Sequence, residues 1–195
     1  ARGDMRIFVG EYAAHGEGSR NNLEAALAEA AFMTGLERNS DLVHMASYAP
    51  LFNKADSSQW VPDLIWFDNT DCYGTPSYYV QKMFSTNLGD TILPHEYQAR
   101  TIASQAELTS GTSGEIGKEA LFIACSRDHD TGDVIIKAVN RLDQAQTVEI
   151  RLEGDFAVSG QGRAEVLTST DPRDENSFAE PRKVAPVLRE LAGLG

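Results

Sequence analysis

The chain has 195 residues, of which 42% are hydrophobic and 24% charged, with a formal net charge of -12 and a pI of about 4.7. These proportions are ordinary for a globular protein, and the length is sufficient for a sizeable core. Phosphate backbones and anionic lipids attract clustered lysine and arginine, so neither nucleic acid nor a membrane surface is an expected partner. No stretch approaches the roughly 20 apolar residues of a membrane span, and a weakly charged ligand such as a sugar suits the charge better.

The first part of the chain begins with a strand and a helix. Residues 6–9 predict a short apolar strand that Gly10 interrupts, and residues 14–20 form a glycine-rich polar loop. Asn21 or Asn22 is expected to cap the helix, and Gly35 to end it in a left-handed conformation. Apolar side chains recur at helical spacing at Leu23, Leu27, Ala30 and Met33, and Glu24 and Glu29 are placed on the solvent side.

The next elements repeat the order of a strand followed by a helix. Residues 41–52 predict a second strand, and residues 63–67 a further short apolar run. Thr75 is expected to cap a helix that has Pro76 at its first position. Strand, helix, strand, helix is typical of a parallel sheet.

Beyond about residue 90 the pattern is nearly all strand and turn. Strands are predicted at 97–108, 119–127, 133–141, 146–152 and 162–169, separated by turn-rich pieces. The third and fourth of these are expected to pair as a hairpin. Several short strands joined by turns predict an antiparallel sandwich.

Two βα units cannot close a sheet or cover both of its faces. The chain is therefore interpreted as the last βα units of a barrel or sheet, followed by a β-sandwich, and is expected to be the tail of a longer protein. In parallel α/β sheets the carboxyl ends of the strands carry the chemistry, which makes Glu11 a candidate nucleophile, base or ligand. A glutamate there can also cap a helix or pair with an arginine, and the residues alone favour this structural role.

The sequence shows no metal-binding or cofactor-binding motif. His15 and His44 have no second histidine at zinc spacing. A calcium loop that began at Asp128 would have Asp133 in place of glycine at its sixth position and Val139 in place of glutamate at its twelfth. Residues 111–119 depart from the spacing of a phosphate loop. Cys72 and Cys125 show no paired spacing, so two free buried thiols are favoured over a disulfide.

Five stretches together resemble the C-terminal part of the α-L-arabinofuranosidases of glycoside hydrolase family 51. They are FVGEYA, ALAEAAFMTGLERNSDLVHMASYAPLF, WVPDLIWFDN, YGTPSYYVQKMFS and DPRDENSFAEPRKVAP, and the resemblance extends over residues 7–186. The resemblance implies a mixed α/β part, residues 1–89, that holds the last two βα units of a (β/α)8 barrel. An all-β part, residues 90–195, would form an antiparallel, jelly-roll-like β-sandwich.

The resemblance also implies the retaining hydrolysis of terminal α-L-arabinofuranosyl groups of arabinan, arabinoxylan or arabino-oligosaccharides. Glu11 matches the family's nucleophile on the seventh barrel strand, whereas the acid/base on the fourth strand has no counterpart in this chain. The chain alone is therefore expected to be inactive. Tyr12, His15, Tyr48, Asn53 and Trp60 are the expected substrate contacts, and Pro50 stands near where some relatives carry a glutamine contact.

No cofactor or metal is expected, and the expected partner is an arabinofuranosyl-containing oligosaccharide or polysaccharide. Many enzymes of the family are oligomers, so a homo-oligomer of the full-length protein is a further expectation. Both a secreted or periplasmic and a cytoplasmic location stay open. The competing hypothesis is a noncatalytic β-sandwich module that binds carbohydrate or stabilises a partner.

Overall fold

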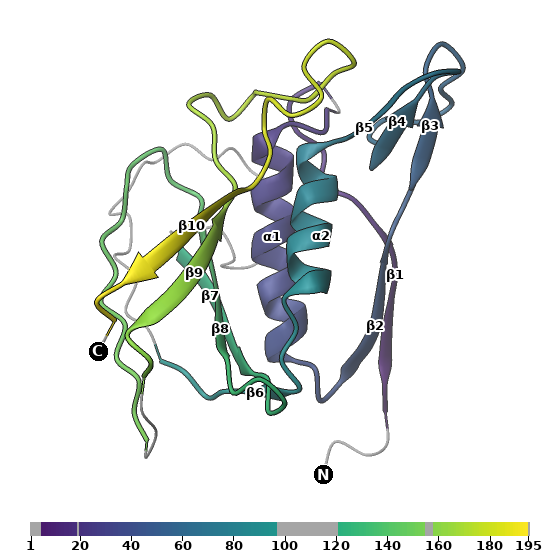
Figure 1. Ribbon diagram of the computed structural model, residues 1–195. Coiled ribbons are helices and arrows are strands. Elements are labelled where there is room, and N and C mark those ends of the chain that lie inside the picture. Colours follow the sequence, from purple (N-terminus) through teal and green to yellow (C-terminus); the bar gives the residue numbers. More distant parts are fainter. Residues whose placement is uncertain (1–4, 19, 97–120, 155–157, 195) are drawn as a thin grey trace, which may run out of the picture.

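A computed structural model describes residues 5–18, 20–96, 121–154 and 158–194 (Figure 1). The helices are α1 (Leu23–Arg38) and α2 (Pro76–Thr86). The strands are β1 (Ile7–Tyr12), β2 (Val43–Tyr48), β3 (Phe52–Lys54), β4 (Ile65–Phe67), β5 (Cys72–Gly74), β6 (Thr91–Ile92), β7 (Leu121–Arg127), β8 (Val134–Asn140), β9 (Gln161–Val166) and β10 (Val187–Ala192). Within these ranges, neither helix has the length and apolar character needed to cross a membrane.

The first strand and helix lead to a parallel partner strand, as the sequence predicts. β1 pairs with β2 in parallel, and α1 connects them. The prediction that Gly10 interrupts the strand is wrong, because β1 continues to Tyr12. Val9 pairs with Ala46 and Glu11 with Ser47, so Gly10 is an extra residue in the ladder. Such bulges change the direction of neighbouring side chains and are frequent next to active sites.

Both helices begin where their capping residues predict. The Asn22 side chain accepts a hydrogen bond from the backbone N–H of Ala25 at 3.0 Å, and Thr75 accepts one from Tyr78 at 3.3 Å. Gly35 does not end α1, which continues to Arg38 and is followed by Asn39. The Asn39 side chain donates to the Gly35 carbonyl at 2.8 Å, so an amide, and not a left-handed glycine, satisfies a carbonyl at the end of this helix.

The second part of the chain forms two separate antiparallel sheets. β6, β7 and β8 make one, and β9 pairs with β10 in the other. The predicted hairpin between β8 and residues 146–152 is wrong, since β8 pairs with β7 and residues 146–152 form no strand. Those residues alternate as a strand would, but no described strand lies beside them to complete a ladder. The predicted strand at 97–108 lies outside the described residues.

The main core lies between the helices and the second part of the chain. Its buried members are Ala26, Ala30, Ala31, Val80, Phe84, Phe122 and Val139. The small alanine side chains of α1 let the helix approach β7 and β8 closely, and Figure 1 shows both helices between these strands and the β1–β2 pair. The Lys137 ammonium on β8 bonds to Glu37 on α1 and lies 4.6 Å from the centre of the Phe84 ring on α2.

The two cysteines are free thiols, as the sequence predicts. Cys72 is exposed, contrary to the expectation of two buried thiols, and Cys125 is partly buried. Burial raises the pKa of the Cys125 thiol.

A long loop from the C-terminal part, residues 168–186, covers the start of α1 (Figure 1). The Asp174 carbonyl accepts from the N–H of Leu23 at 2.9 Å, and the Pro172 carbonyl accepts from Glu24 at 2.8 Å. The first N–H groups of a helix have no partners within the helix, so the loop satisfies two of them. The loop therefore joins the C-terminal part of the chain to the N-terminal end of α1, which is the end that the loop after β1 leads into.

Asn176 is expected to hold this loop in place. Its amide donates to the carbonyls of Gly74 at 2.8 Å and Val184 at 3.0 Å, and its oxygen accepts from the Val184 N–H at 2.7 Å. Asn176→Ala leaves three backbone groups without partners and is expected to lower the free energy of unfolding by about 2 kcal/mol. Urea unfolding measures the loss, and Asn69→Ala, at an exposed position, is the control. Equal stability of the two variants would contradict this role.

Candidate active site

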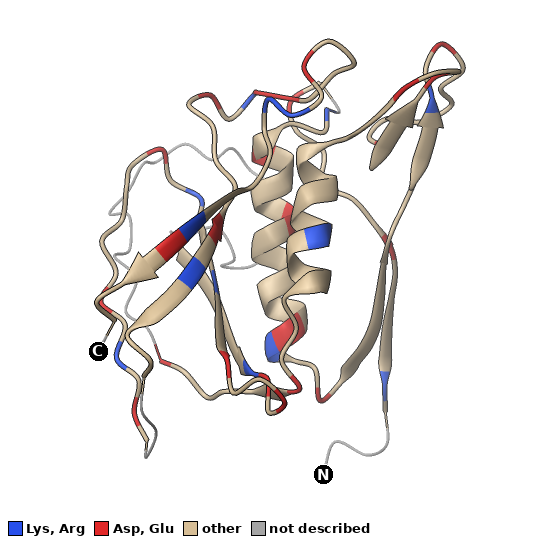
Figure 2. Ribbon diagram, in the orientation of Figure 1, with Lys and Arg blue, Asp and Glu red and all other residues tan. Residues whose placement is uncertain are grey.

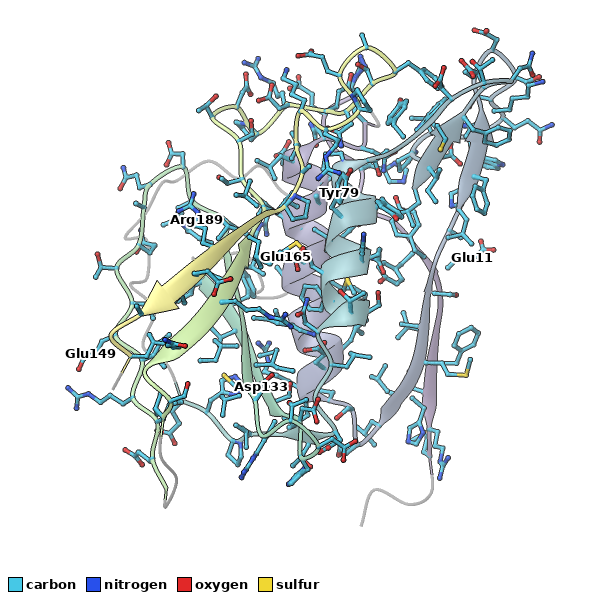
Figure 3. All side chains as sticks on the ribbon, in the orientation of Figure 1. Glu11, Tyr79, Asp133, Glu149, Glu165 and Arg189 are labelled. Atoms are coloured by element: carbon cyan, nitrogen blue, oxygen red, sulfur yellow. The ribbon has the colours of Figure 1, made fainter. Side chains whose placement is uncertain are left out.

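The candidate site lies at the carboxyl ends of β1 and β2. Glu11 pairs with Ser47, and Tyr12 with Tyr48. Glu11 is the one Asp, Glu, Lys or Arg residue of these two strands, and Figure 2 shows it as the single red segment on the pair. Its side chain lies on the side of the strands away from α1 and α2 (Figure 3).

The Glu11 carboxylate is exposed and makes no hydrogen bond or ion pair with any described residue. The helix-capping and arginine-pairing roles that the residues alone favour are therefore not seen in the described part of the chain. A carboxylate at the end of a parallel strand, free of protein partners, is available to act as a nucleophile, a base or a ligand.

Tyr12 points toward the helices, as expected for the neighbour of Glu11 along a strand. Its ring packs edge-on against Phe32 at 5.3 Å and Tyr48 at 5.9 Å between ring centres. The Tyr12 hydroxyl exchanges hydrogen bonds with the Gln81 amide at 2.9 to 3.1 Å. Burial raises the pKa of the Tyr12 phenol, and the charge of Glu29 adds to the rise while Gln81 opposes it.

Tyr48 and Asn53 are buried side chains within one polar network. The Tyr48 hydroxyl accepts from the Asn21 amide at 3.0 Å, and Asn21 accepts from the N–H of Asp63 at 2.7 Å. The Asn53 amide donates to the Asp63 carboxylate. Burial is the largest cause of a raised pKa at Tyr48. The network fixes the segments after β2 relative to the start of α1.

His15 and Trp60 are exposed. His15 stands in the loop after β1. The Trp60 side chain is 71% exposed, while its backbone carbonyl accepts from Asn53 at 2.8 Å and from Ser58 at 2.7 Å. These two hydrogen bonds hold the loop backbone at Trp60, and the exposed indole ring is free to contact a ligand.

Glu29 is a functional candidate whose position was predicted wrongly from the sequence. It is expected on the solvent side of α1, but its side chain is 2% exposed. It follows Ala26 by three residues and Ala25 by four, which puts it on the buried face of the helix. That spacing is the signal that could have identified it. Its carboxylate accepts from the N–H of Ala14, in the loop after β1, at 3.0 Å.

The described residues contain no group of three or more His, Cys, Asp or Glu side chains arranged to hold a metal ion. The described side chains at this edge of the sheet offer carboxylate, phenol, imidazole and amide groups. Such groups carry acid–base and nucleophilic catalysis on sugars.

The family model described as the α-L-arabinofuranosidase C-terminal domain matches residues 10–194. The chain belongs to this family. α-L-Arabinofuranosidase 2 of Arabidopsis thaliana is 38% identical over 186 residues, which are 95% of this chain and 25% of that protein. The chain thus spans about a quarter of the length of this curated relative.

Solved structures agree with the family. An arabinose-bound α-L-arabinofuranosidase of glycoside hydrolase family 51 is 31% identical with a TM-score of 0.81, covering 98% of this chain and 30% of that one. A thermostable family 51 enzyme from Thermotoga petrophila, 17% identical with a TM-score of 0.76 over 96% of this chain and 39% of its own, shows the same fold.

The predicted resemblance to the C-terminal part of the family 51 enzymes is therefore confirmed. The family and the antiparallel sheets of the second part support a sandwich-like β domain. The match begins at Gly10 and so includes the α/β part of the chain as well. A noncatalytic β-sandwich module has no need of that part, and the hydrolase hypothesis is favoured over it.

Proposed function

We propose that this chain is part of a retaining α-L-arabinofuranosidase, to which it contributes the nucleophile and a C-terminal β domain. Residues 1–89 would supply the last two βα units of a (β/α)8 barrel, and residues 90–195 a jelly-roll-like β-sandwich. The parallel β1–α1–β2 unit supports the first assignment. So do the exposed apolar side chains of Phe8 and Met45, because both faces of a barrel strand are normally covered.

Glu11 carries the proposal. It is an exposed carboxylate without protein partners in the described ranges, at the carboxyl end of a parallel strand, in a chain of the arabinofuranosidase family. In a barrel this end of the strands faces the substrate. Glu11 would attack the anomeric carbon of the arabinofuranosyl group and form a covalent ester as the leaving oxygen departs.

A second carboxyl group, from a part of the enzyme outside this chain, would protonate the leaving oxygen and then activate water. Retaining enzymes hold their two carboxyl groups roughly 5–5.5 Å apart. Water would then give up a proton to that second group, attack the anomeric carbon and displace the Glu11 carboxylate, releasing arabinose with its original configuration. The chain alone would lack the acid/base, which is why residues 1–195 by themselves are expected to be inactive.

The remaining predicted substrate contacts form two groups, one of exposed side chains and one of side chains that are at least half-buried. His15 and Trp60 are proposed to touch the sugar, Trp60 at a neighbouring subsite, where an indole face can stack on a ring. Tyr12, Tyr48 and Asn53 already have protein partners. The buried positions of Tyr48 and Asn53 and the half-buried position of Tyr12 favour support of the sugar-binding surface over extensive direct contact.

The proposed partners are arabinofuranosyl oligosaccharides or polysaccharides, in line with the name of the plant relative and with the arabinose bound to the structural relative. The reaction as written needs no cofactor. Assembly of the full-length protein into a homo-oligomer remains a proposal.

The stereochemistry of the reaction tests the proposal. The whole protein that carries this chain is expected to hydrolyse an aryl α-L-arabinofuranoside, and with methanol present to yield methyl α-L-arabinofuranoside, because two displacements at carbon restore the configuration. Proton NMR of the first product distinguishes the anomers. Absence of hydrolysis, or a methyl β-L-arabinofuranoside, would refute it.

A further inference from the structure

Glu29 is a buried carboxyl group that the proposed reaction does not use. Its Oε1 accepts from the Ala14 N–H at 3.0 Å. Its Oε2 and the buried Ser77 hydroxyl have no hydrogen-bond partner in the described ranges. Unpartnered buried polar atoms are rare in native structures and call for an explanation.

The contacts of Glu29 connect α1 to the loop that follows Glu11. Ala14 is three residues beyond Glu11 and immediately precedes His15. On α2, Gln81 bonds to the hydroxyl of Tyr12, the neighbour of Glu11. The two helices therefore hold the chain at both Tyr12 and Ala14, just beyond the Glu11 carboxylate.

The surroundings of Glu29 favour its neutral form. Burial raises the pKa of its carboxyl to about 7, against weaker opposing effects of the Ala14 N–H, Ser77 and Gln81. The titratable groups that face it are the phenols of Tyr12 and Tyr48, with Asp63 acting on Tyr48, and no basic side chain is among these groups. An ionised Glu29 would place an uncompensated negative charge inside the protein.

On the basis of the proposed function, we propose that Glu29 is a positioning residue that holds the loop of residues 13–16, and through it Glu11 and His15, in the arrangement for hydrolysis. The neutral carboxyl accepts from the Ala14 N–H through one oxygen and donates its proton to Ser77 through the other. This arrangement gives partners to both atoms that otherwise lack them. Ionisation keeps the acceptor for Ala14 but leaves an uncompensated charge in the interior, which favours opening of the loop so that water can reach the carboxylate.

The pH dependence of kcat/KM in the whole enzyme tests this role. The wild type is expected to lose activity above about pH 7, by about tenfold at about pH 8, since one proton is lost from the competent form. Glu29→Gln cannot ionise and keeps both an acceptor and a donor, so it is expected to retain activity within about threefold near pH 6 and to show only the alkaline decline that comes from the general acid. Glu29→Ala is expected to lose about tenfold or more across the range.

Glu24→Gln, at an exposed position on the same helix, is the matched control and should follow the wild type. Unchanged alkaline behaviour in Glu29→Gln, or wild-type kinetics in Glu29→Ala, would overturn the proposal. If Glu29→Ala does not fold, the pH dependence of kcat/KM in Glu29→Gln still tests the proposal.

The Ala14 amide resonance separates this proposal from the proposed function. Its NMR shift should titrate with a midpoint near that of Glu29 in the wild type and stay flat in Glu29→Gln. Titration without arabinofuranosidase activity would refute the proposed function while confirming the contact. Activity without titration at Ala14 would refute the positioning role alone.

Discussion

In the whole enzyme that carries this chain, Glu11→Gln is expected to reduce kcat/KM for an aryl α-L-arabinofuranoside by at least about a thousandfold, because an amide cannot form the glycosyl ester. The Glu11 carboxylate has no partner among the described side chains, so the substitution should leave stability within about 0.5 kcal/mol. Steady-state kinetics and urea unfolding of the same preparation measure both effects. Glu17→Gln, at an exposed position in the loop beyond β1, should retain nearly full activity.

Glu11→Ala offers a second and independent test of the same residue. The shorter side chain leaves space for a small anion, and azide can then attack the anomeric carbon directly. A single displacement inverts the configuration, so the expected product is β-L-arabinofuranosyl azide. Recovery of activity with this product identifies Glu11 as the nucleophile. Near-normal activity in Glu11→Gln would exclude that role.

Local signals predicted the helices of this protein well. Asn22 and Thr75 cap their helices because their short side chains accept hydrogen bonds from N–H groups that have no partner within the helix. Pro76 occupies the first turn of α2, where its missing N–H costs nothing. The apolar run around residues 43–48 likewise predicted a strand, and its parallel pairing with β1 followed from the intervening helix.

Features that depend on distant partners could not be predicted in the same way. Residues 146–152 have a strand-like pattern, but a strand needs a neighbour, and no described strand pairs with these residues. β10 has no distinctive strand pattern and is a strand because β9 lies beside it. The position of Glu29 failed for a related reason, since a carboxylate was assumed to face solvent although Ala14 supplies a buried donor.

The candidate site likewise has features that the sequence predicted and features that required the structure. The position of Glu11 on β1 followed from the pattern of the strand, and its lack of partners required the structure. Tyr48 and Asn53 were assigned to ligand contact because the resemblance to the family places substrate-contacting polar groups after the eighth strand. The structure places them in a network with Asn21 and Asp63, two residues whose sequence context gave no indication of this role.

Glu29→Gln is expected to stabilise the protein at neutral and alkaline pH. The pKa of this carboxyl is about 7 in the folded protein against an ordinary value of 4.5. Between these values the folded state binds a proton that the unfolded chain has released, so the free energy of unfolding falls as the pH rises. The stabilising contribution is complete below pH 4.5 and is lost as the pH passes 7.

The accumulated loss in the wild type amounts to about 3 kcal/mol. Glutamine carries no titrating proton and keeps the acceptor for Ala14, so the variant should not show this loss. The two proteins should therefore differ little in acid, and the variant should be the more stable by about 3 kcal/mol at about pH 8. Urea unfolding over this pH range measures the difference, with Glu24→Gln as the exposed control. Parallel stability curves for Glu29→Gln and the wild type would mean that Glu29 is already ionised inside the folded protein, and that its charge is compensated by a group other than the tyrosines, serine and glutamine around it.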